Sequence, residues 1–261
     1  MDLNRSAYEQ THFNTITDYY DIYHKLYLDI WGNNDNLPLH VGYYDNNESK
    51  FISHDASIIK MNKFIAEKAK IKKSDLILDA GCSVGGSSIW FAKNYGARII
   101  GISFSKKEIN LAKKFAQQKS IHNVEFKVMD YHNIEFSSET FDTILAIESV
   151  CYSYDKEKFL DECYRLLKKN GKIIITDYFK VDDLVTDLQK KWIDKINKDY
   201  SLDLCSMAEF KNYLNKFIYS DLTDITSNVI NSYIEGLKLK ILIYLLNQKN
   251  LKKILLENLT G

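Results

Sequence analysis

The chain has 261 residues, of which 45% are hydrophobic and 27% charged, so it is long enough and apolar enough to fold around a substantial core. Lys and Arg together number 35, as do Asp and Glu, and the resulting net charge of zero gives no electrostatic reason to expect a nucleic-acid partner. The four cysteines are widely spaced and form no C-x-x-C pair, which favours reduced thiols and argues against a metal site.

The first 50 residues are rich in aromatic side chains and histidine. The sequence opens without the apolar segment of a secretory signal, so we expect a cytoplasmic protein. Apolar and aromatic residues recur at helical spacing from about residue 15 to residue 30, which predicts a helix there. Packing beneath a cover is the simpler interpretation for most of these rings, although Tyr and Trp also suit the rim of an apolar ligand site because each carries a polar tip.

Helix and strand patterns alternate from residue 51 to residue 180. Helical patterns cover residues 51–70 and 88–95, and a capping box of Ser105 and Glu108 begins a helix that runs to about residue 119. Another helix begins at Asp155 and ends at Asn170-Gly171. Apolar runs predict strands at residues 76–78, 97–103, 123–129, 141–147 and 172–176. This alternation indicates βαβ units, so the sequence predicts an α/β fold with a doubly wound, mostly parallel sheet.

The pattern changes after residue 180. Residues 181–200 and 207–217 have helical patterns, residues 218–225 have the pattern of a sixth strand, and residues 226–258 that of an amphipathic helix. The longest apolar run in this last part covers residues 241–246 and is far too short to span a bilayer, so we expect no stable membrane insertion. We expect residues 181–217, as a lid inserted after strand five, to form the cover of the site together with the aromatic N-terminal segment.

The stretch that organises the chain is Leu76–Ser88, in which an aliphatic strand is followed by a turn with three glycines and then by a helix. Glycines let a ligand approach the backbone closely, and N–H groups at the start of the helix face that ligand. Asp79 lies at the carboxyl end of the strand, which is where ligands bind in open α/β sheets. The stretch therefore predicts a binding site.

Three functional interpretations compete with an ordinary strand-to-helix turn. A loop for a nucleotide-type cofactor of the S-adenosylmethionine kind fits the glycines and the acid before them. A dinucleotide fingerprint fits poorly, because Ser83 replaces its middle glycine and Ser103 stands where the ribose acid is expected, about 20 residues on. Gly81-Cys-Ser-Val-Gly85 also matches a nucleophile elbow, but that site needs a later acid followed by a histidine, and no histidine follows His122 and His132.

Polar residues also follow the other predicted strands. Because the carboxyl ends of parallel strands share one edge of a sheet, this edge should gather Asp79, Ser103, Asp130 and Glu148. Ser103 could hydrogen-bond ribose hydroxyls, and Asp130 could accept from an adenine amino group with Tyr131 beside the ring. Backbone N–H groups of the glycine turn could hold a carboxylate or a sugar.

Several segments resemble those of a known family. Asp79-Ala-Gly-Cys-Ser-Val-Gly-Gly86 resembles the first motif of class I S-adenosylmethionine-dependent methyltransferases, usually D-x-G-C-G-x-G-G. Tyr164–Lys172 resembles the segment before strand five of that family. Tyr19–Asp21, Trp31-Gly32 and His40–Tyr44 resemble the small-molecule branch, which includes tocopherol, sterol, cyclopropane-fatty-acid-type and natural-product methyltransferases. The resemblance covers roughly residues 15–180 well and residues 200–236 weakly.

The resemblance implies a Rossmann-like methyltransferase fold with a helical N-terminal cover. Glu148 would act on the acceptor side in carbon methylation, and His40 is the best-placed base for oxygen methylation. The cofactor contacts that it implies are Tyr20, Tyr43, Tyr44, Asp79, Gly81, Ser103, Phe104, Asp130 and Tyr131.

Three features depart from the family pattern. Ser83 replaces a usual glycine, and we expect it to be tolerated with a negative φ. Ser103 replaces the acidic ribose ligand of many relatives, although Ser or Thr occurs there in this branch. The seventh strand of the family is not legible after residue 226.

The sequence thus predicts a methyltransferase that uses S-adenosylmethionine, releases S-adenosylhomocysteine and acts on a small, partly apolar metabolite. The whole chain, 1–261, would form one domain, with a cover at 1–50, a cofactor-binding core at 51–180 and a lid and C-terminal part at 181–261. We expect a monomer or homodimer. The alternatives are a dinucleotide-dependent oxidoreductase and a non-catalytic S-adenosylmethionine-binding regulatory protein.

Overall fold

The computed structural model describes residues 14–15, 40–45, 52–181, 186–214, 217 and 223–229. Nearly all of the predicted helix at 15–30, residues 218–222 of the predicted sixth strand and residues 230–258 lie outside this part. The chain divides into two compact units. The first consists of residues 1–40 and 64–222, and the second of residues 41–63 and 223–261.

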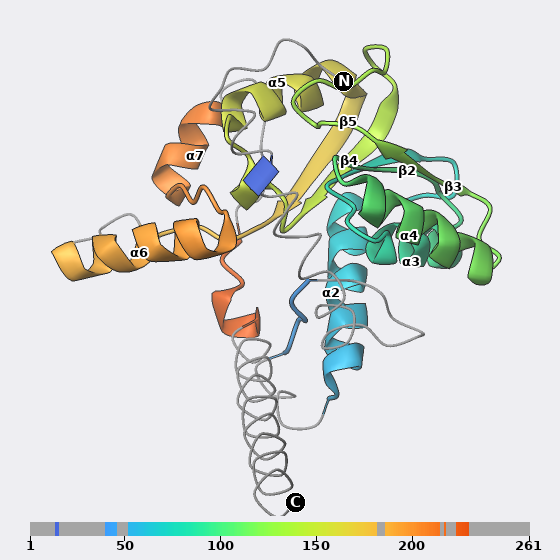
Figure 1. The fold of residues 1–261 in the computed structure, drawn as a ribbon. Helices are drawn as coiled ribbons and strands as arrows, with labels where there is room; N and C mark the ends of the chain where they lie inside the picture. Colours follow the sequence, from blue (N-terminus) through green and yellow to red (C-terminus); the bar gives the residue numbers. More distant parts are fainter. Residues whose placement is uncertain are drawn as a thin grey trace, which may run out of the picture. The chain divides into compact units, whose positions relative to one another are not determined.

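The first unit contains a five-stranded sheet in the order β3-β2-β1-β4-β5 (Figure 1). All the neighbouring pairs are parallel. The chain runs outward from β1 to β3 and then returns to β4 on the other side of β1, so the order of strands reverses between β1 and β4. Ligands of such sheets bind at this reversal, beyond the carboxyl ends of the strands. The strands are β1 Leu76–Ala80, β2 Arg98–Ser103, β3 Val124–Val128, β4 Phe141–Ile147 and β5 Leu167–Thr176.

Helices cover both faces of the sheet. Leu78, Ile100 and Ile144 belong to one buried cluster with residues of α5 and α7. On the other face, Phe126 of β3 packs with residues of α3 and α4, and it fits beside β2 because Gly101 has no side chain. The described helices are α2 His54–Ala69, α3 Gly86–Tyr95, α4 Lys106–Gln118, α5 Lys156–Leu166, α6 Asp187–Tyr200, α7 Met207–Tyr213 and the short 3₁₀ helix η1 Val150–Tyr152. The predicted α/β, doubly wound fold is confirmed.

The predicted end of the helix before strand five was wrong. The helix begins after its cap at Asp155, as expected, but ends at Leu166 rather than at Asn170-Gly171. Leu167 is extended and pairs with Phe141, so β5 begins five residues earlier than predicted. The register shifts between Phe141 and Thr143 of β4, and Asn170 takes a positive φ of 66° in the irregular part of the strand. Strand pairing therefore prevails over the turn signal of Asn170-Gly171.

The helix predicted within residues 181–200 forms α6. Thr186 and Gln189 close a capping box at its start. None of its residues is buried, and Leu188 and Trp192 are 65% and 57% exposed. The structure thus confirms the helix, while its role as a lid stays a prediction.

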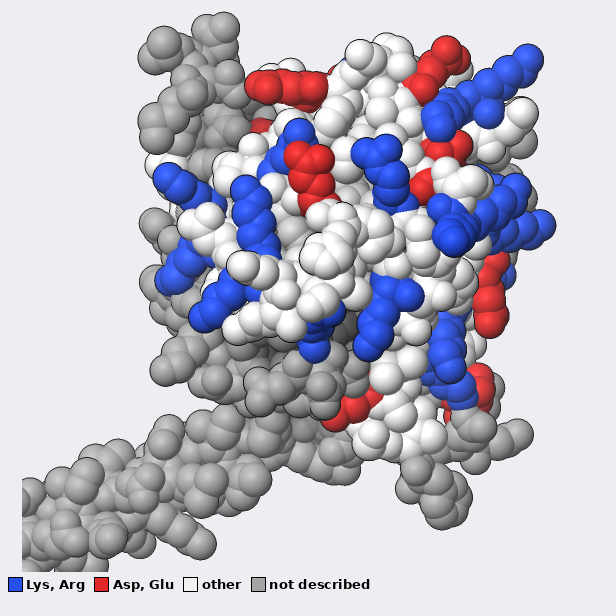
Figure 2. Space-filling view, turned by 90° about the vertical axis from the view of Figure 1, so that its right-hand side faces the viewer, with Lys and Arg blue, Asp and Glu red and all other residues white. Residues whose placement is uncertain are grey.

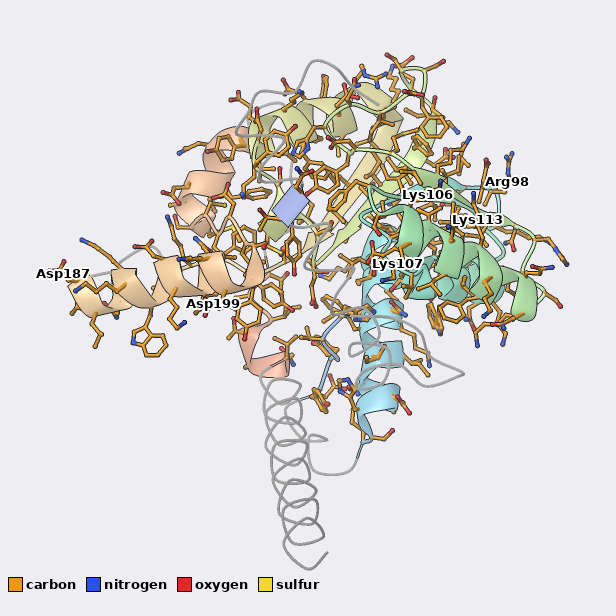
Figure 3. The ribbon with its side chains drawn as sticks, viewed as in Figure 1. Arg98, Lys106, Lys107, Lys113, Asp187 and Asp199 are labelled. Carbon is orange, nitrogen blue, oxygen red and sulfur yellow. The ribbon has the colours of Figure 1, made fainter. Side chains whose placement is uncertain are left out.

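Four lysines of α4 lie away from its buried residues. Lys106, Lys107, Lys113 and Lys114 are exposed, whereas Glu108 is buried. Figure 2 shows one side of the molecule, on which Lys and Arg are more numerous than Asp and Glu. Figure 3 labels Arg98 and three lysines of α4 on one side of the ribbon, and acidic residues at the two ends of α6. The exposed lysines of α4 follow from a helix that buries one face and exposes the other.

The second unit joins the segment 41–45 to residues 223–229. The backbone N–H of Tyr44 donates to the Asn228 carbonyl across 2.7 Å, and the Asn228 amide donates to the Tyr44 carbonyl across 2.9 Å. The N–H of Tyr43 donates to the carbonyl of Ser57 in α2. Residues 226–229 are helical, and residues 223–225 form no strand. Within the described ranges, every helix is too short or too polar to cross a bilayer.

Candidate functional site

The turn after β1 is built around Gly81, which has a φ of 95°. A Cβ atom at this position would lie 2.5 Å from the Cβ of Ser149, so the turn has no room for a side chain. The N–H groups of Gly81 and Cys82 both donate to the carbonyl of Ile102 on β2. The neighbouring strand thus engages these two N–H groups, and the contact of Gly81 with a cofactor stays a prediction.

The start of α3 supplies the remaining backbone of the turn. Gly85 is the N-cap, with a φ of 80°, and a Cβ atom there would lie 2.5 Å from the Phe126 ring. The first N–H groups of any α-helix have no partner inside the helix. Gly86 and Ser87, in the first turn of α3, line the pocket described below. This helix start is thus the part of the motif that suits an anionic or polar ligand group.

Ser83 does not have the negative φ that the sequence analysis expected. Its φ is 48°, in the left-handed region that a side chain disfavours. The Ser83 hydroxyl donates to Oε1 of Glu108 across 2.6 Å. This hydrogen bond offsets the cost of the backbone conformation, which explains how a serine occupies a position where glycine is usual.

Glu108 also binds Ser103, at the end of β2. The Ser103 hydroxyl donates to Oε2 of Glu108 across 2.7 Å and accepts from the N–H of Ser105. In the sequence, Glu108 fits the pattern of a capping-box acid. The Ser105 hydroxyl does accept from the N–H of Glu108, but the Glu108 carboxylate turns to the two serines instead. A buried carboxylate thus stands beside Ser103, at the end of β2.

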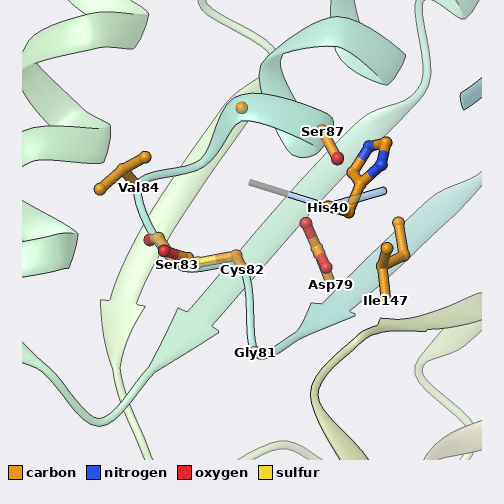
Figure 4. A pocket seen from close by; sticks show the side chains of 9 residues that line it. His40, Asp79, Gly81, Cys82, Ser83, Val84, Ser87 and Ile147 are labelled. Carbon is orange, nitrogen blue, oxygen red and sulfur yellow. Dashed lines mark hydrogen bonds between the residues drawn. The ribbon is translucent and has the colours of Figure 1, made fainter. Parts of the chain in front are cut away.

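A pocket lies at the reversal between β1 and β4 and occupies about 320 Å³, including the part open to solvent. Figure 4 shows Asp79 of β1, Ile147 of β4, Ser87 of α3 and His40 gathered around it. Asp79 and His40 are 2% and 4% exposed. The lining residues are His40, Asp79, Gly81, Cys82, Ser83, Val84, Gly86, Ser87 and Ile147.

Burial shapes the electrostatics of this pocket. It raises the pKa of Asp79 from 3.8 to about 6, although a hydrogen bond from the Ser88 hydroxyl opposes the rise. Burial and the nearby carboxylates of Asp79 and Glu108 also raise the pKa of the Cys82 thiol well above its usual range, so it is a poor nucleophile. Among the residues that the structure describes, none forms an ion pair with Asp79. A buried carboxylate of this kind favours a cationic ligand group, because the opposite charge stabilises its ionised form.

Asp130 lies just beyond β3 and binds His132. Its Oδ1 accepts from the backbone N–H of His132 across 2.9 Å, and Nδ1 of the same histidine lies 2.8 Å away. Tyr131 is 6% exposed and belongs to the buried core, and its hydroxyl donates to the Ser149 carbonyl. The contact of Tyr131 with an adenine ring stays a prediction.

Glu148 follows β4 with a φ of 50°, a conformation that a non-glycine residue adopts at a cost. Its N–H donates to the Thr176 carbonyl across 2.7 Å, and its Oε2 accepts from the Tyr178 hydroxyl. Asp177 accepts from the N–H groups of Val150 and Cys151, and burial raises its pKa. The ends of β4 and β5 are thus tied together, and Glu148 is held by them.

Sequence reasoning missed Asp177 and Tyr178. Asp177 follows β5 directly, so the rule that selected the other strand-end acids would have found it. Tyr178 had no signal in the sequence. Tyr43 and Tyr44 belong to the second unit, Tyr20 lies outside the described residues, and Phe104 is partly buried beside Ser103. Their contacts with a cofactor stay predictions. The described residues contain no cluster of three His, Cys, Asp or Glu that could hold a metal ion.

A parallel sheet with a glycine turn and a carboxylate-lined pocket at its strand reversal defines a protein of the nucleotide-cofactor-binding class. The chain belongs to the methyltransferase domain family, whose model matches residues 71–253. The family predicted from the sequence is therefore confirmed.

Three curated relatives illustrate the family. Norajmaline N-methyltransferase of Rauvolfia serpentina is 33% identical over 198 residues, which cover 70% of this chain and 68% of the relative. Sterol 24-C-methyltransferase of Kluyveromyces lactis is 29% identical, over 85% of this chain and 58% of the relative. Tocopherol O-methyltransferase of Arabidopsis thaliana is 28% identical, over 79% of this chain and 63% of the relative. The chain thus spans about three-fifths to two-thirds of the length of these relatives.

Solved structures share the fold at lower identity. A geranyl diphosphate methyltransferase in complex with GPP and sinefungin has a TM-score of 0.76 at 18% identity, over 86% of this chain and 88% of that one. The [4+2]-cyclase SpnF has a TM-score of 0.74 at 20% identity, over 85% of this chain and 79% of that one. Because the second protein is a cyclase, the fold by itself does not determine the reaction.

Proposed function

We propose that this chain transfers a methyl group from S-adenosylmethionine to a small, partly apolar metabolite. The observation that carries the proposal is the buried Asp79 carboxylate beside the glycine turn, at the strand reversal of a methyltransferase-family chain. S-adenosylmethionine has an ammonium and a sulfonium group, and a buried carboxylate that no cation of the described ranges neutralises suits such a ligand. The dinucleotide alternative loses its support, since the family is that of methyltransferases.

The cofactor's nucleoside would lie toward β2 and β3. Glu108 and Ser103 present a carboxylate and a hydroxyl at the end of β2, and both groups can bind ribose hydroxyls. Asp130, beyond β3, would accept from the adenine amino group. These assignments extend the sequence-based contacts by one residue, Glu108, which replaces the acid expected at the position of Ser103.

The acceptor would lie toward the end of β4. Ile147 gives this side of the pocket an apolar wall, and Glu148 follows it with its carboxylate held by Tyr178. His40 lines the same pocket and remains the candidate base for oxygen methylation. The named substrates of the relatives, an alkaloid, a sterol and a tocopherol, support an acceptor that is largely apolar.

When bound, S-adenosylmethionine supplies a methyl group on a sulfonium, whose leaving group is already good. The residues of the chain then have three tasks: to hold the acceptor in line, to exclude water and to accept a proton or stabilise positive charge at the acceptor. Glu148 suits the last task in carbon methylation, and His40 suits it in oxygen methylation. We also propose that the chain acts as one methyltransferase domain in the cytoplasm, which rests on the sequence alone.

Calorimetry with S-adenosylmethionine, S-adenosylhomocysteine and NAD tests the cofactor. We expect binding of the first two at micromolar concentrations, on the order of −8 kcal/mol, and no binding of NAD. A screen with methyl-labelled S-adenosylmethionine and metabolite extracts then tests catalysis through label in an extractable product. Binding without any labelled product would favour a regulatory protein, and binding of NAD alone would refute the proposal.

A further inference from the structure

The ring of His132 has a polar partner at each nitrogen and contacts two aromatic rings. Nδ1 lies 2.8 Å from Oδ1 of Asp130, and Nε2 lies 2.8 Å from the hydroxyl of Ser153. The ring of Tyr154 packs against it at 4.0 Å between centroids, and the ring of Tyr131 lies at 4.6 Å. His132 is 4% exposed and Ser153 is fully buried. The histidine therefore has one well-defined orientation.

The chemistry of these partners assigns the proton on each nitrogen. An ionised carboxylate is an acceptor, so Nδ1 must carry the proton that is shared with Asp130. In the neutral ring, Nε2 then accepts from the Ser153 hydroxyl. Oδ1 of Asp130 thus receives two donors from one residue, the ring N–H and the backbone N–H of His132. Two donors at one oxygen fix the plane of the carboxylate.

This carboxylate stands at the edge of the sheet where the candidate site lies. The N–H of Met129 donates to the Ser103 carbonyl across 3.0 Å, which fastens the segment before Asp130 to the end of β2. The Tyr131 hydroxyl donates to the Ser149 carbonyl, which fastens the segment after it to the end of β4. A side chain that orients Asp130 therefore acts on a group at the binding edge rather than in the interior alone.

We propose that His132 is a positioning residue for cofactor recognition: it holds the Asp130 carboxylate in the orientation that accepts from the exocyclic amino group of the adenine base. The inference rests on the proposed function, because Asp130 must be the residue that reads the base. It goes further in assigning base discrimination to the pair Asp130–His132. A histidine that merely fills the core would contribute to folding and leave the choice of base unchanged.

The test compares two ligands and two variants. S-adenosylhomocysteine carries the amino group, and S-inosylhomocysteine carries a carbonyl oxygen in its place. We expect the wild type to bind the first about tenfold to a hundredfold more tightly, the scale of a hydrogen bond to a charged group. His132→Asn places an amide N–H near the position of Nδ1 and should keep most of this ratio. His132→Gln places its amide near Nε2 and should reduce the ratio about fivefold to tenfold.

Two control variants distinguish the role of His132 from that of Asp130. His122→Gln changes an exposed histidine before β3 and should leave the ratio as in the wild type. Asp130→Ala should bring the ratio close to one. If it does not, Asp130 does not read the base and that part of the proposed function fails. If Asp130→Ala abolishes the preference while His132→Gln retains it, or if the Asn and Gln variants lose it equally, the role of His132 is refuted and the proposed function stands.

A measurement on the wild-type protein does not depend on the folding of any variant. Nitrogen-15 spectra of the histidine rings report which nitrogen of His132 carries the proton. A protonated Nδ1 is the expected result, because the Asp130 carboxylate can only accept there. A ring protonated solely at Nε2 would overturn the inference, since such a ring cannot donate to Asp130.

Discussion

The hydroxyl of Ser83 donates to the carboxylate of Glu108 across 2.6 Å, and this bond joins the glycine turn to the start of α4. Ser83 has a φ of 48°, so the bond forms where the backbone itself is strained. The turn that borders the pocket therefore depends on a side chain twenty-five residues further along the chain.

Replacing Ser83 by Ala and by Gly separates the hydrogen bond from the backbone strain. Ser83→Ala keeps the positive φ and removes a donor from a buried carboxylate, so it should destabilise the protein by about 1–3 kcal/mol. Ser83→Gly loses the same bond but relieves the backbone, and should be less harmful by about 1 kcal/mol. Denaturant unfolding measures both. Glu139→Gly, at an exposed positive φ of 52°, reports the backbone effect alone. Equal losses for the Ala and Gly variants would refute the explanation.

Gly81 and Gly96 both have positive φ but differ in their surroundings. At Gly81 a Cβ atom would meet the Cβ of Ser149 at 2.5 Å, whereas at Gly96 it would meet the flexible side chain of Lys73 at 3.2 Å. Gly96→Ala should lower the free energy of unfolding only by the backbone strain, about 1–2 kcal/mol. Gly81→Ala should cost more, about 3 kcal/mol or above, and should weaken cofactor binding through the distorted turn. Thermal unfolding and calorimetry of the two variants check the difference, and similar losses would contradict it.

The sequence predicts the sheet well because hydrophobic runs and glycine turns are local signals. Strand β4 has the predicted bounds, residues 141–147, and the strand-end rule brings Asp79, Ser103 and Glu148 to one edge. The rule also applies to Asp177, which the sequence analysis did not select. These successes depend on strand direction, which the alternation of helices and strands sets.

Other features of the site depend on tertiary contacts that no local pattern encodes. The left-handed backbone of Ser83 is accompanied by a hydrogen bond to Glu108, and the capping-box pattern gave that glutamate a different role. The N–H groups of Gly81 and Cys82 bind Ile102, which becomes visible once β1 and β2 are paired. Helix α5 ends early for the same kind of reason, because Leu167 gains a strand partner in Phe141.

Asp79 should make both folding and cofactor binding depend on pH. Burial raises its pKa from 3.8 to about 6, so the folded state without cofactor holds the proton more tightly than the unfolded state. The stabilisation by this proton is complete below pH 3.8 and is lost as the pH rises through about 6. At neutral pH the ionised carboxylate therefore costs the folded state up to about 3 kcal/mol.

Asp79→Asn should separate stability from function. The variant should be more stable than the wild type above about pH 6, by about 1–3 kcal/mol, and should bind S-adenosylmethionine at least tenfold more weakly, because a cationic ligand loses its counter-charge. Wild-type affinity should rise between about pH 5 and pH 8, and that of the variant should stay flat. Asp194→Asn, an exposed change on α6, serves as the control and should alter neither property. A variant less stable than the wild type at neutral pH would contradict the assignment.

Glu148 and Tyr178 give the sharpest test of the acceptor side. Glu148→Gln keeps the shape of the side chain and removes its charge, so we expect nearly unchanged affinity for S-adenosylmethionine and turnover lower by roughly 10²-fold or more. Tyr178→Phe removes the hydroxyl that binds Oε2 of Glu148, and should lower turnover by about tenfold, again without a change in cofactor affinity. Steady-state kinetics with a saturating acceptor from the metabolite screen measure both effects. Glu157→Gln, an exposed change on α5, controls for the loss of an acid elsewhere.

The relative size of the two losses of turnover, in Glu148→Gln and in Tyr178→Phe, tests the role of Glu148. If Glu148 acts on the acceptor, its own loss must cost more than the loss of the phenol that holds it, and the double variant should be no slower than Glu148→Gln alone. Additive losses would mean that Tyr178 contacts the acceptor independently. Turnover of Glu148→Gln close to that of the wild type would make Glu148 a structural residue that fixes the end of β4 against Tyr178. In that case His40, which lines the same pocket, is the base to be replaced next, and His40→Gln should then show the loss of turnover that Glu148→Gln did not.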